Sequence, residues 1–124
     1  MTVHGIVVKG SGTAGKVFSV PTANLVFDVA PNIAAGVYAG LVSIASHKKN
    51  ALPAAICVGA DGKNKFEVHI LDFDGNLVGT TLDVEVLDRV SDIVPWESEE
   101  QMRKKIQNDL VIVRNFIKMS NNKT

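Results

Sequence analysis

The sequence is a succession of short, β-branched apolar segments separated by residues that favour turns. Runs of this kind are typical of strands, and Gly, Pro, Asn and Asp between them mark the turns. The expected strands are 3–9, a short extended piece at 25–27, and then 37–45, 54–58, 66–73 and 80–87. Five or six short strands joined by turns predict an all-β fold, an antiparallel sheet closed into a small barrel.

The apolar residues at the end of the chain recur with a different period from those in the expected strands. Ser98, followed by two glutamates, can cap a helix, because its hydroxyl accepts a hydrogen bond from a first-turn amide and acidic residues suit the positive end of the helix dipole. Apolar residues then recur at spacings of three and four: Met102, Ile106, Leu110, Val113 and Ile117. This pattern predicts one C-terminal helix with a single apolar stripe. Residues 120–124 are expected to be a frayed, polar tail.

Composition and charge limit the classes of partner. The 124 residues carry 13 Lys and Arg and 13 Asp and Glu, so the formal net charge is zero. A neutral chain lacks the basic surface that binds nucleic acid or acidic membranes, and we expect neither partner. No apolar stretch approaches the ~18 residues of a membrane-spanning helix, and the N-terminus lacks a signal segment. We expect a cytoplasmic protein with one domain over residues 1–124.

The single cysteine, Cys57, cannot form an internal disulfide. It lies in the apolar run Ala-Ala-Ile-Cys-Val at residues 54–58. A cysteine in such a run packs as a small apolar side chain, so we expect Cys57 to be buried and unreactive.

The stretch GSGTAGKV at residues 10–17 satisfies three nucleotide-binding motifs at once. It contains the G-x-G-x-x-G of a dinucleotide-binding turn, the same motif with the valine of protein kinases, and the G-x-x-x-x-G-K of a P-loop. A dinucleotide turn and a P-loop must both lead into a helix, whereas this stretch leads into the extended segment 17–21. The chain is also too short for a protein kinase and lacks H-R-D and D-F-G. A different phosphate-binding loop and a flexible hairpin both remain open on spacing alone.

The segment that follows, Pro21-Thr22-Ala23-Asn24, resembles the P-T-A-N signature of riboflavin kinases. Gly36-Val37-Tyr38 is similar to the family's G-[VI]-Y segment, and Glu67-Val68-His69 to its E-x-H strand. Residues 5–16 resemble the opening strand and glycine loop, and residues 87–109 the closing loop and helix. P-T-A-N together with E-x-H at this distance is specific, whereas either motif alone is weak.

The resemblance implies both a fold and a reaction. The family has a six-stranded antiparallel Greek-key barrel with a C-terminal α-helix, which agrees with the strands and the helix predicted above. Its members transfer the γ-phosphate of ATP to the ribityl 5′-hydroxyl of riboflavin and so make FMN. Riboflavin and ATP are then the expected partners. Mg²⁺ is the expected cation, with Zn²⁺ or Mn²⁺ as alternatives, and a monomer is the expected state.

Three residues carry the chemistry that the resemblance implies. Glu67 corresponds to the base that accepts the proton of the 5′-hydroxyl, and Thr22 and Asn24 correspond to ligands of the cation. Neutral oxygen ligands suit a Mg²⁺ that shares its shell with water and phosphate oxygens. Without the resemblance, Glu67 would be an exposed carboxylate on an alternating strand, and Thr22 and Asn24 would be turn residues. His69, on the same face as Glu67, is expected to pack or to form hydrogen bonds and not to bind metal.

The resemblance places ATP on the glycine loop and the flavin near two later residues. Glycine backbone can approach a nucleotide closely, and a lysine adds a point charge. The implied ATP-binding residues are Gly10, Gly12, Gly15 and Lys16. Arg89 and Trp96 are implied to bind the flavin, although Trp96 fits equally well as a side chain that packs the helix onto the barrel.

The sequence departs from the family pattern at three places. Ser19 stands where the family has a glycine, the loop after Gly59 is short, and residues 90–95 lack the usual R-P-E start. These departures keep open a second hypothesis, a relative that holds flavin or nucleotide without turnover. A third, an unrelated barrel that binds oligonucleotides, is weakened by the zero net charge and the few aromatic residues. The nucleotidyltransferase domain of bifunctional bacterial relatives is not in the sequence, so FAD is not an expected product.

Overall fold

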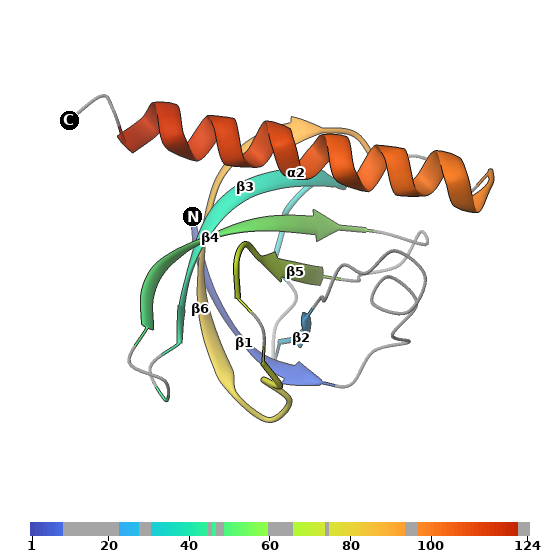
Figure 1. The fold of residues 1–124 in the computed structure, drawn as a ribbon. Coiled ribbons are helices and arrows are strands. Elements are labelled where there is room, and N and C mark those ends of the chain that lie inside the picture. The colour runs from blue at the N-terminus through green and yellow to red at the C-terminus, as the bar shows by residue number, and fades with distance from the viewer. Residues whose placement is uncertain are drawn as a thin grey trace.

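Six antiparallel strands in the described part of the chain close into a barrel, and one long helix lies along its outside (Figure 1). The computed structural model describes residues 1–8, 23–27, 31–44, 46, 49–59, 66–73, 75–93 and 97–121. The strands are β1 (Thr2–Val8), β2 (Ala23–Val26), β3 (Gly36–Ile44), β4 (Lys49–Val58), β5 (Phe66–Ile70) and β6 (Thr81–Ser91), and the helix is α2 (Glu99–Asn121). The predicted all-β barrel with a C-terminal helix is confirmed.

The strands are arranged around the barrel in the order β1-β2-β5-β4-β3-β6, and β6 closes the circle by pairing with β1. β3, β4 and β5 are successive neighbours, and the chain then returns to lay β6 beside β3. Three consecutive strands with a fourth that returns beside the first make a Greek key. The topology implied by the resemblance is therefore present.

The inside of the barrel is a filled core. Side chains alternate between the two faces of a strand. In β5, Phe66, Val68 and Ile70 point inward and are at most 5% exposed, whereas Glu67 and His69 between them face outward and are half-buried. The largest fully buried side chains from the other strands are Val42, Ile44, Ile56, Leu82 and Val84. These branched side chains leave the outer face and the rims as the places where a ligand can bind.

Helix α2 covers the outer face of β3, β4 and β6 (Figure 1). Two small residues, Ala39 and Ala55, lie beneath Val113 and Ile117 of the predicted apolar stripe, and all four are buried. Because α2 covers the outer side of β3, that strand is largely buried on both faces. In the part of the chain that the structure describes, no helix has both the length and the apolar character needed to cross a membrane.

The start of the helix follows the sequence-based expectation. The Oγ of Ser98 accepts a hydrogen bond from the amide of Gln101 at 3.2 Å, and its carbonyl accepts one from the amide of Met102 at 3.0 Å. Ser98 is thus the N-cap that satisfies a free first-turn donor.

Several strand ends differ from the prediction. The structure ends β5 at Ile70 and not at residue 73. The amide of Leu71 still donates to the carbonyl of Pro53 at 2.8 Å, but proline has no N–H to donate in return, and Asp72 turns the chain with a φ of 57°. Asp72 then forms a two-pronged ion pair with Arg114 of α2, at 2.8 and 3.3 Å. This turn is therefore connected to the helix by an exposed ion pair.

Three other strands are longer than predicted because a neighbouring strand supplies backbone partners. β4 begins at Lys49, since its first residues pair with the end of β3. β6 continues to Ser91, which lies opposite Val37 of β3. β2 begins at Ala23, which lies opposite Val68 of β5.

Gly40, on the inner face of β3, generates a test of the barrel packing. A Cβ at this position would lie 2.3 Å from Cδ1 of Ile56 and 2.6 Å from the backbone oxygen of Glu85. We predict that Gly40→Ala lowers the free energy of unfolding by about 1–3 kcal/mol through overpacking, measured by urea denaturation. In the control Gly75→Ala, the contact that the new Cβ makes within the described part of the chain is with the Phe73 ring, at 3.3 Å, and we expect a change within about 0.5 kcal/mol. Equal losses in the two variants would contradict this account.

Candidate active site

Two of the residues assigned from the P-T-A-N and E-x-H motifs lie side by side. Asn24 of β2 is the direct cross-strand partner of Glu67 of β5. Directly opposed residues project from the same face of a sheet, with Cβ atoms about 4.5–5.5 Å apart. Because Val68, the next residue along β5, points into the core, Asn24 and Glu67 both project from the outer face. The structure thus brings the amide of Asn24 and the carboxylate of Glu67 together.

The Asn24–Glu67 pair is part of a longer line of cross-strand neighbours. Cys57 of β4 lies opposite Glu67, Val37 of β3 lies opposite Cys57, and Ser91 of β6 lies opposite Val37. We call these five residues, from Asn24 to Ser91, the outer row. Adjacent strands are about 4.8 Å apart, so the row follows the curve of the barrel in steps of that size. Its β4, β3 and β6 members belong to the strands on which α2 packs.

The pKa of Cys57, in the middle of the outer row, depends on burial and on nearby charged groups. The pKa of its thiol is raised from the ordinary 9.0 to about 12, chiefly by burial and also by the carboxylates of Glu67 and Asp109, while the ammonium of Lys105 acts in the opposite direction. A thiol with this pKa stays neutral at physiological pH. This agrees with the expectation of an unreactive cysteine, whereas the expected full burial is not met, because Cys57 is only partly buried. It also means that Glu67, Asp109 and Lys105 all lie within electrostatic reach of one sulfur atom.

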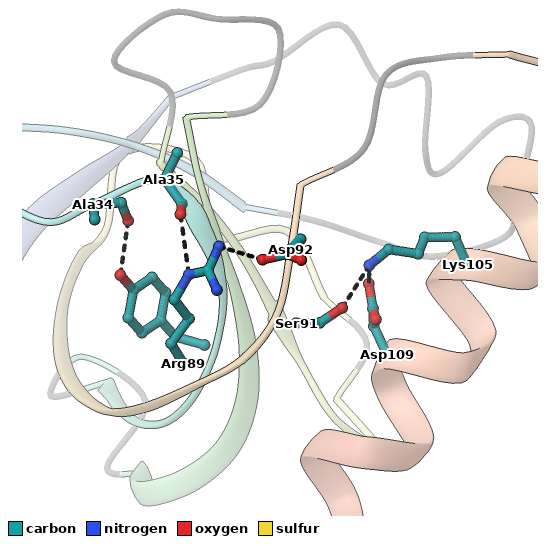
Figure 2. Close-up of polar contacts among 8 residues, drawn as sticks. Ala34, Ala35, Arg89, Ser91, Asp92, Lys105 and Asp109 are labelled. Carbon is teal, nitrogen blue, oxygen red and sulfur yellow. Dashed lines mark hydrogen bonds and ion pairs between the residues drawn. The ribbon is translucent and has the colours of Figure 1, made fainter.

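Helix α2 contributes a polar group that sequence reasoning missed. Lys105 donates hydrogen bonds to Oδ2 of Asp109 and, at 2.8 Å, to Oγ of Ser91, so that helix and strand are joined (Figure 2). We call Ser91, Lys105 and Asp109 the seam cluster. The side chains of Lys105 and Asp109 are only 22% and 10% exposed. The available signal was a lysine and an aspartate four residues apart, with Asp109 directly before Leu110 of the apolar stripe.

Arg89, assigned to the flavin by resemblance, has protein partners in the structure. Its Nε donates to the carbonyl of Ala35 at 3.2 Å, and its guanidinium pairs with Asp92 at 2.5 Å (Figure 2). A Cβ on Gly36 would lie 2.4 Å from the same Nε. Arg89 therefore supports the segment that leads into β3. A role in binding flavin stays a prediction.

The other assigned residues lie outside the part of the chain that the structure describes. They are Gly10, Gly12, Gly15, Lys16, Thr22 and Trp96. The roles of the first four in binding ATP, of Thr22 in binding metal and of Trp96 in binding flavin stay predictions.

The donor set on β2 and β5 fits a hard divalent cation. Among the described residues, no group of three or more His, Cys, Asp or Glu side chains could hold a metal ion. Asn24 offers an amide oxygen and its neighbour Glu67 a carboxylate. Mg²⁺ prefers oxygen ligands and usually keeps several waters and phosphate oxygens in its shell, so few protein ligands suffice. These residues are compatible with a cation that arrives bound to a nucleotide.

The reactivity of Cys57 tests this description of the outer row. Only the thiolate is nucleophilic, and a pKa of about 12 in place of 9.0 lowers the thiolate fraction at pH 8 by roughly 1000-fold. We predict that iodoacetamide alkylates native Cys57 at least about 100-fold more slowly than it alkylates the urea-unfolded protein, measured by mass spectrometry. The native rate should rise as the pH is raised toward 12. Similar rates in the two states would show that the thiol is neither buried nor flanked by carboxylates.

Comparisons with known proteins identify the family and agree with the fold. A family model described as "Flavokinase: Riboflavin kinase" matches residues 1–117. A solved structure from Streptococcus pneumoniae, described as a macrolide-efflux protein, is 32% identical with a TM-score of 0.79, covering 92% of this chain and 38% of that one. This chain thus spans less than half of that protein. The riboflavin kinase of Trypanosoma brucei is 20% identical with a TM-score of 0.66, covering 94% of this chain and 79% of that one, and shares its fold. The match over residues 1–117 shows that the chain belongs to the flavokinase, or riboflavin kinase, family.

Proposed function

We propose that this chain transfers the γ-phosphate of ATP to the ribityl 5′-hydroxyl of riboflavin, giving FMN and ADP. The observation that carries the proposal is the cross-strand pairing of Asn24 with Glu67 in a member of the flavokinase family. The amide oxygen of Asn24 is of the type that suits a divalent cation, and the Glu67 carboxylate beside it can accept a proton. Phosphoryl transfer to an alcohol needs both functions at the same place.

In the proposed reaction, Glu67 holds and deprotonates the acceptor hydroxyl. The hydroxyl oxygen attacks the γ-phosphorus, the bond from that phosphorus to the β–γ bridging oxygen breaks, and the proton passes to the Glu67 carboxylate. ADP leaves with the bridging oxygen. Enzymes accelerate this chemistry chiefly by positioning the two substrates and by stabilising the charge on the transferred group.

Asn24, with Thr22 before it, is proposed to hold the divalent cation that accompanies ATP. When bound, the cation supplies neutralising charge to the phosphate oxygens. The proposed contacts to the phosphates themselves come from the loop residues Gly10, Gly12, Gly15 and Lys16. Arg89 and Trp96 are the proposed contacts to the flavin ring.

The neighbourhood of Glu67 supports its role as a base. The next member of the outer row, Cys57, is a neutral thiol and does not compete for the proton at physiological pH. The inward-pointing neighbours Phe66 and Val68 are at most 3% exposed, so they fix the strand from which Glu67 projects. A carboxylate on a rigid strand can be held at the distance that proton transfer requires.

Substitution of Glu67 gives the test of the proposed function. The unchanged protein, mixed with riboflavin, ATP and magnesium, should form FMN, followed by chromatography. Glu67→Gln keeps the shape of the side chain and removes the base, so kcat should fall about 100- to 10,000-fold while the affinity for riboflavin changes little. Glu85→Gln, at an exposed glutamate on β6, is the matched control and should keep kcat within about twofold.

Two outcomes would contradict the proposal. Absence of FMN under saturating conditions would overturn the kinase activity, and binding of flavin or nucleotide without turnover would identify the chain as a non-catalytic relative. Normal FMN formation with a Glu67→Gln kcat within about threefold of the unchanged protein would overturn the assignment of the base alone.

The metal role of Asn24 can be tested separately. Asn24→Ala removes one oxygen ligand from an outward-facing position, so the barrel should keep its thermal midpoint. Even groups outside the ligand shell change metal affinity by about 10- to 100-fold, so the Mg²⁺ concentration for half-maximal activity should rise at least about tenfold. Asn108→Ala, at an exposed position of α2, is the control and should leave the magnesium titration unchanged. A normal titration for Asn24→Ala would remove it from the metal site.

A further inference from the structure

The seam cluster satisfies only one of the two oxygens of the Asp109 carboxylate. Oδ2 accepts a hydrogen bond from Lys105, whose ammonium also donates to Ser91 (Figure 2). Oδ1 is buried and accepts no hydrogen bond from any residue that the structure describes. Within the same part of the chain, Asp109 is the only polar or charged residue that is buried, with 7% of its surface exposed.

A buried carboxylate oxygen without a donor is unfavourable, because the group has lost its water and gained nothing in return. Native proteins satisfy the great majority of such atoms, so an unsatisfied oxygen calls for a donor from a water, an ion or a bound molecule. Lys105, which also donates to Ser91, holds the carboxylate by its other oxygen. Oδ1 is therefore an acceptor held in a defined direction.

Asp109 lies close to the proposed base. Both Asp109 and Glu67 are near enough to the Cys57 thiol to raise its pKa, and Cys57 is the cross-strand neighbour of Glu67. Ser91, which shares Lys105 with Asp109, is the end of the outer row beyond Cys57 and Val37. Asp109 is thus linked through Lys105 to the Ser91 end of the outer row, and its carboxylate also acts on Cys57, which lies one strand spacing of about 4.8 Å from Glu67.

We propose that Asp109 is a substrate-binding residue whose Oδ1 accepts a hydrogen bond from an inner hydroxyl of the polyol chain that carries the reacting hydroxyl. The inference rests on the proposed function, because it takes the terminal hydroxyl to lie at Glu67. A polyol carries further hydroxyl donors on the carbons next to its end, and these follow the outer row toward Asp109. The site would then select acceptors with a hydroxylated chain over acceptors with a plain alkyl alcohol.

Two flavins separate a contact to the polyol from a contact to the ring. Riboflavin carries the full ribityl chain. A flavin with a 5-hydroxypentyl chain keeps the ring, the chain length and the terminal hydroxyl and lacks the inner hydroxyls. The equilibrium affinity for each is measured by quenching of flavin fluorescence, in the presence of ADP and magnesium, so no turnover is needed. The unchanged protein should bind riboflavin roughly 10- to 100-fold more tightly than the hydroxypentyl flavin, as expected for a hydrogen bond to a charged acceptor.

Asp109→Asn should abolish this preference. The amide oxygen would face Lys105 and the amide nitrogen, a donor, would face the substrate hydroxyl. Riboflavin affinity should fall roughly 10- to 100-fold, while affinity for the hydroxypentyl flavin stays within about threefold. Glu100→Gln makes the same chemical change at an exposed position of α2 and should preserve the affinities for both flavins.

The remaining outcomes overturn the inference. Equal loss of affinity for the two flavins in Asp109→Asn would assign the residue to the ring or to folding, and unchanged affinity for riboflavin would mean that a buried water satisfies Oδ1. If Asp109→Asn does not fold, equal affinity of the unchanged protein for the two flavins is still sufficient to reject the inference. A protein that prefers riboflavin but forms no FMN would support this contact and contradict the proposed kinase activity, so the two failures are distinguishable.

Discussion

The position of β5 between β2 and β4 is the constraint on which the rest of the site depends. The strand has five residues and pairs on both sides, with Ala23 and Asn24 on one edge and with 54–58 on the other. A shift of one residue in either pairing would turn Glu67 into the core and one of its apolar neighbours out to solvent. Burial of Phe66, Val68 and Ile70 therefore holds the carboxylate outward, opposite Asn24. The same packing that stabilises the barrel aligns the two groups that the proposed chemistry uses.

Helix α2 excludes water from one part of the outer face of the barrel. Ala39 and Ala55 are small enough for Val113 and Ile117 to lie directly on β3 and β4. Polar groups at the border of this contact lose water as a consequence, which explains the raised pKa of Cys57 and the burial of Asp109. Electrostatic interactions and hydrogen bonds are stronger in such surroundings than in water. The helix thus gives the site its environment, and the strands give it its geometry.

The sequence was sufficient for those features that local pattern determines. Alternation in 66–70 and the spacing of Val113 and Ile117 predicted a strand and a helix, and Ser98 predicted the helix start. The predicted strand ends were wrong where a residue far away in the sequence determines the end of the strand. β5 ends early because Pro53, opposite Leu71, has no N–H to donate back and Asp72 turns the chain, and β6 continues to Ser91 because β3 lies beside it. Motifs indicated Asn24 and Glu67 separately, but their pairing depends on strands that are not consecutive. Asp109 was missed because a charged residue on a helix is ordinarily exposed, and only packing against the barrel buries it.

The filled core also explains how this fold can carry specificity. Six strands enclose too little space for a flavin, and fully buried side chains such as Ile56 and Leu82 occupy what there is. Recognition must then come from the outer face and from the segments at its border, whose residues can change without disturbing the core. Lys105 is an example of such a residue outside the core. It lies on α2 and donates hydrogen bonds to Asp109 on the same helix and to Ser91 of β6. If Asp109 has the role proposed for it, a substitution in this cluster alters what the site accepts and leaves the register of β5, and with it the placement of Glu67, intact.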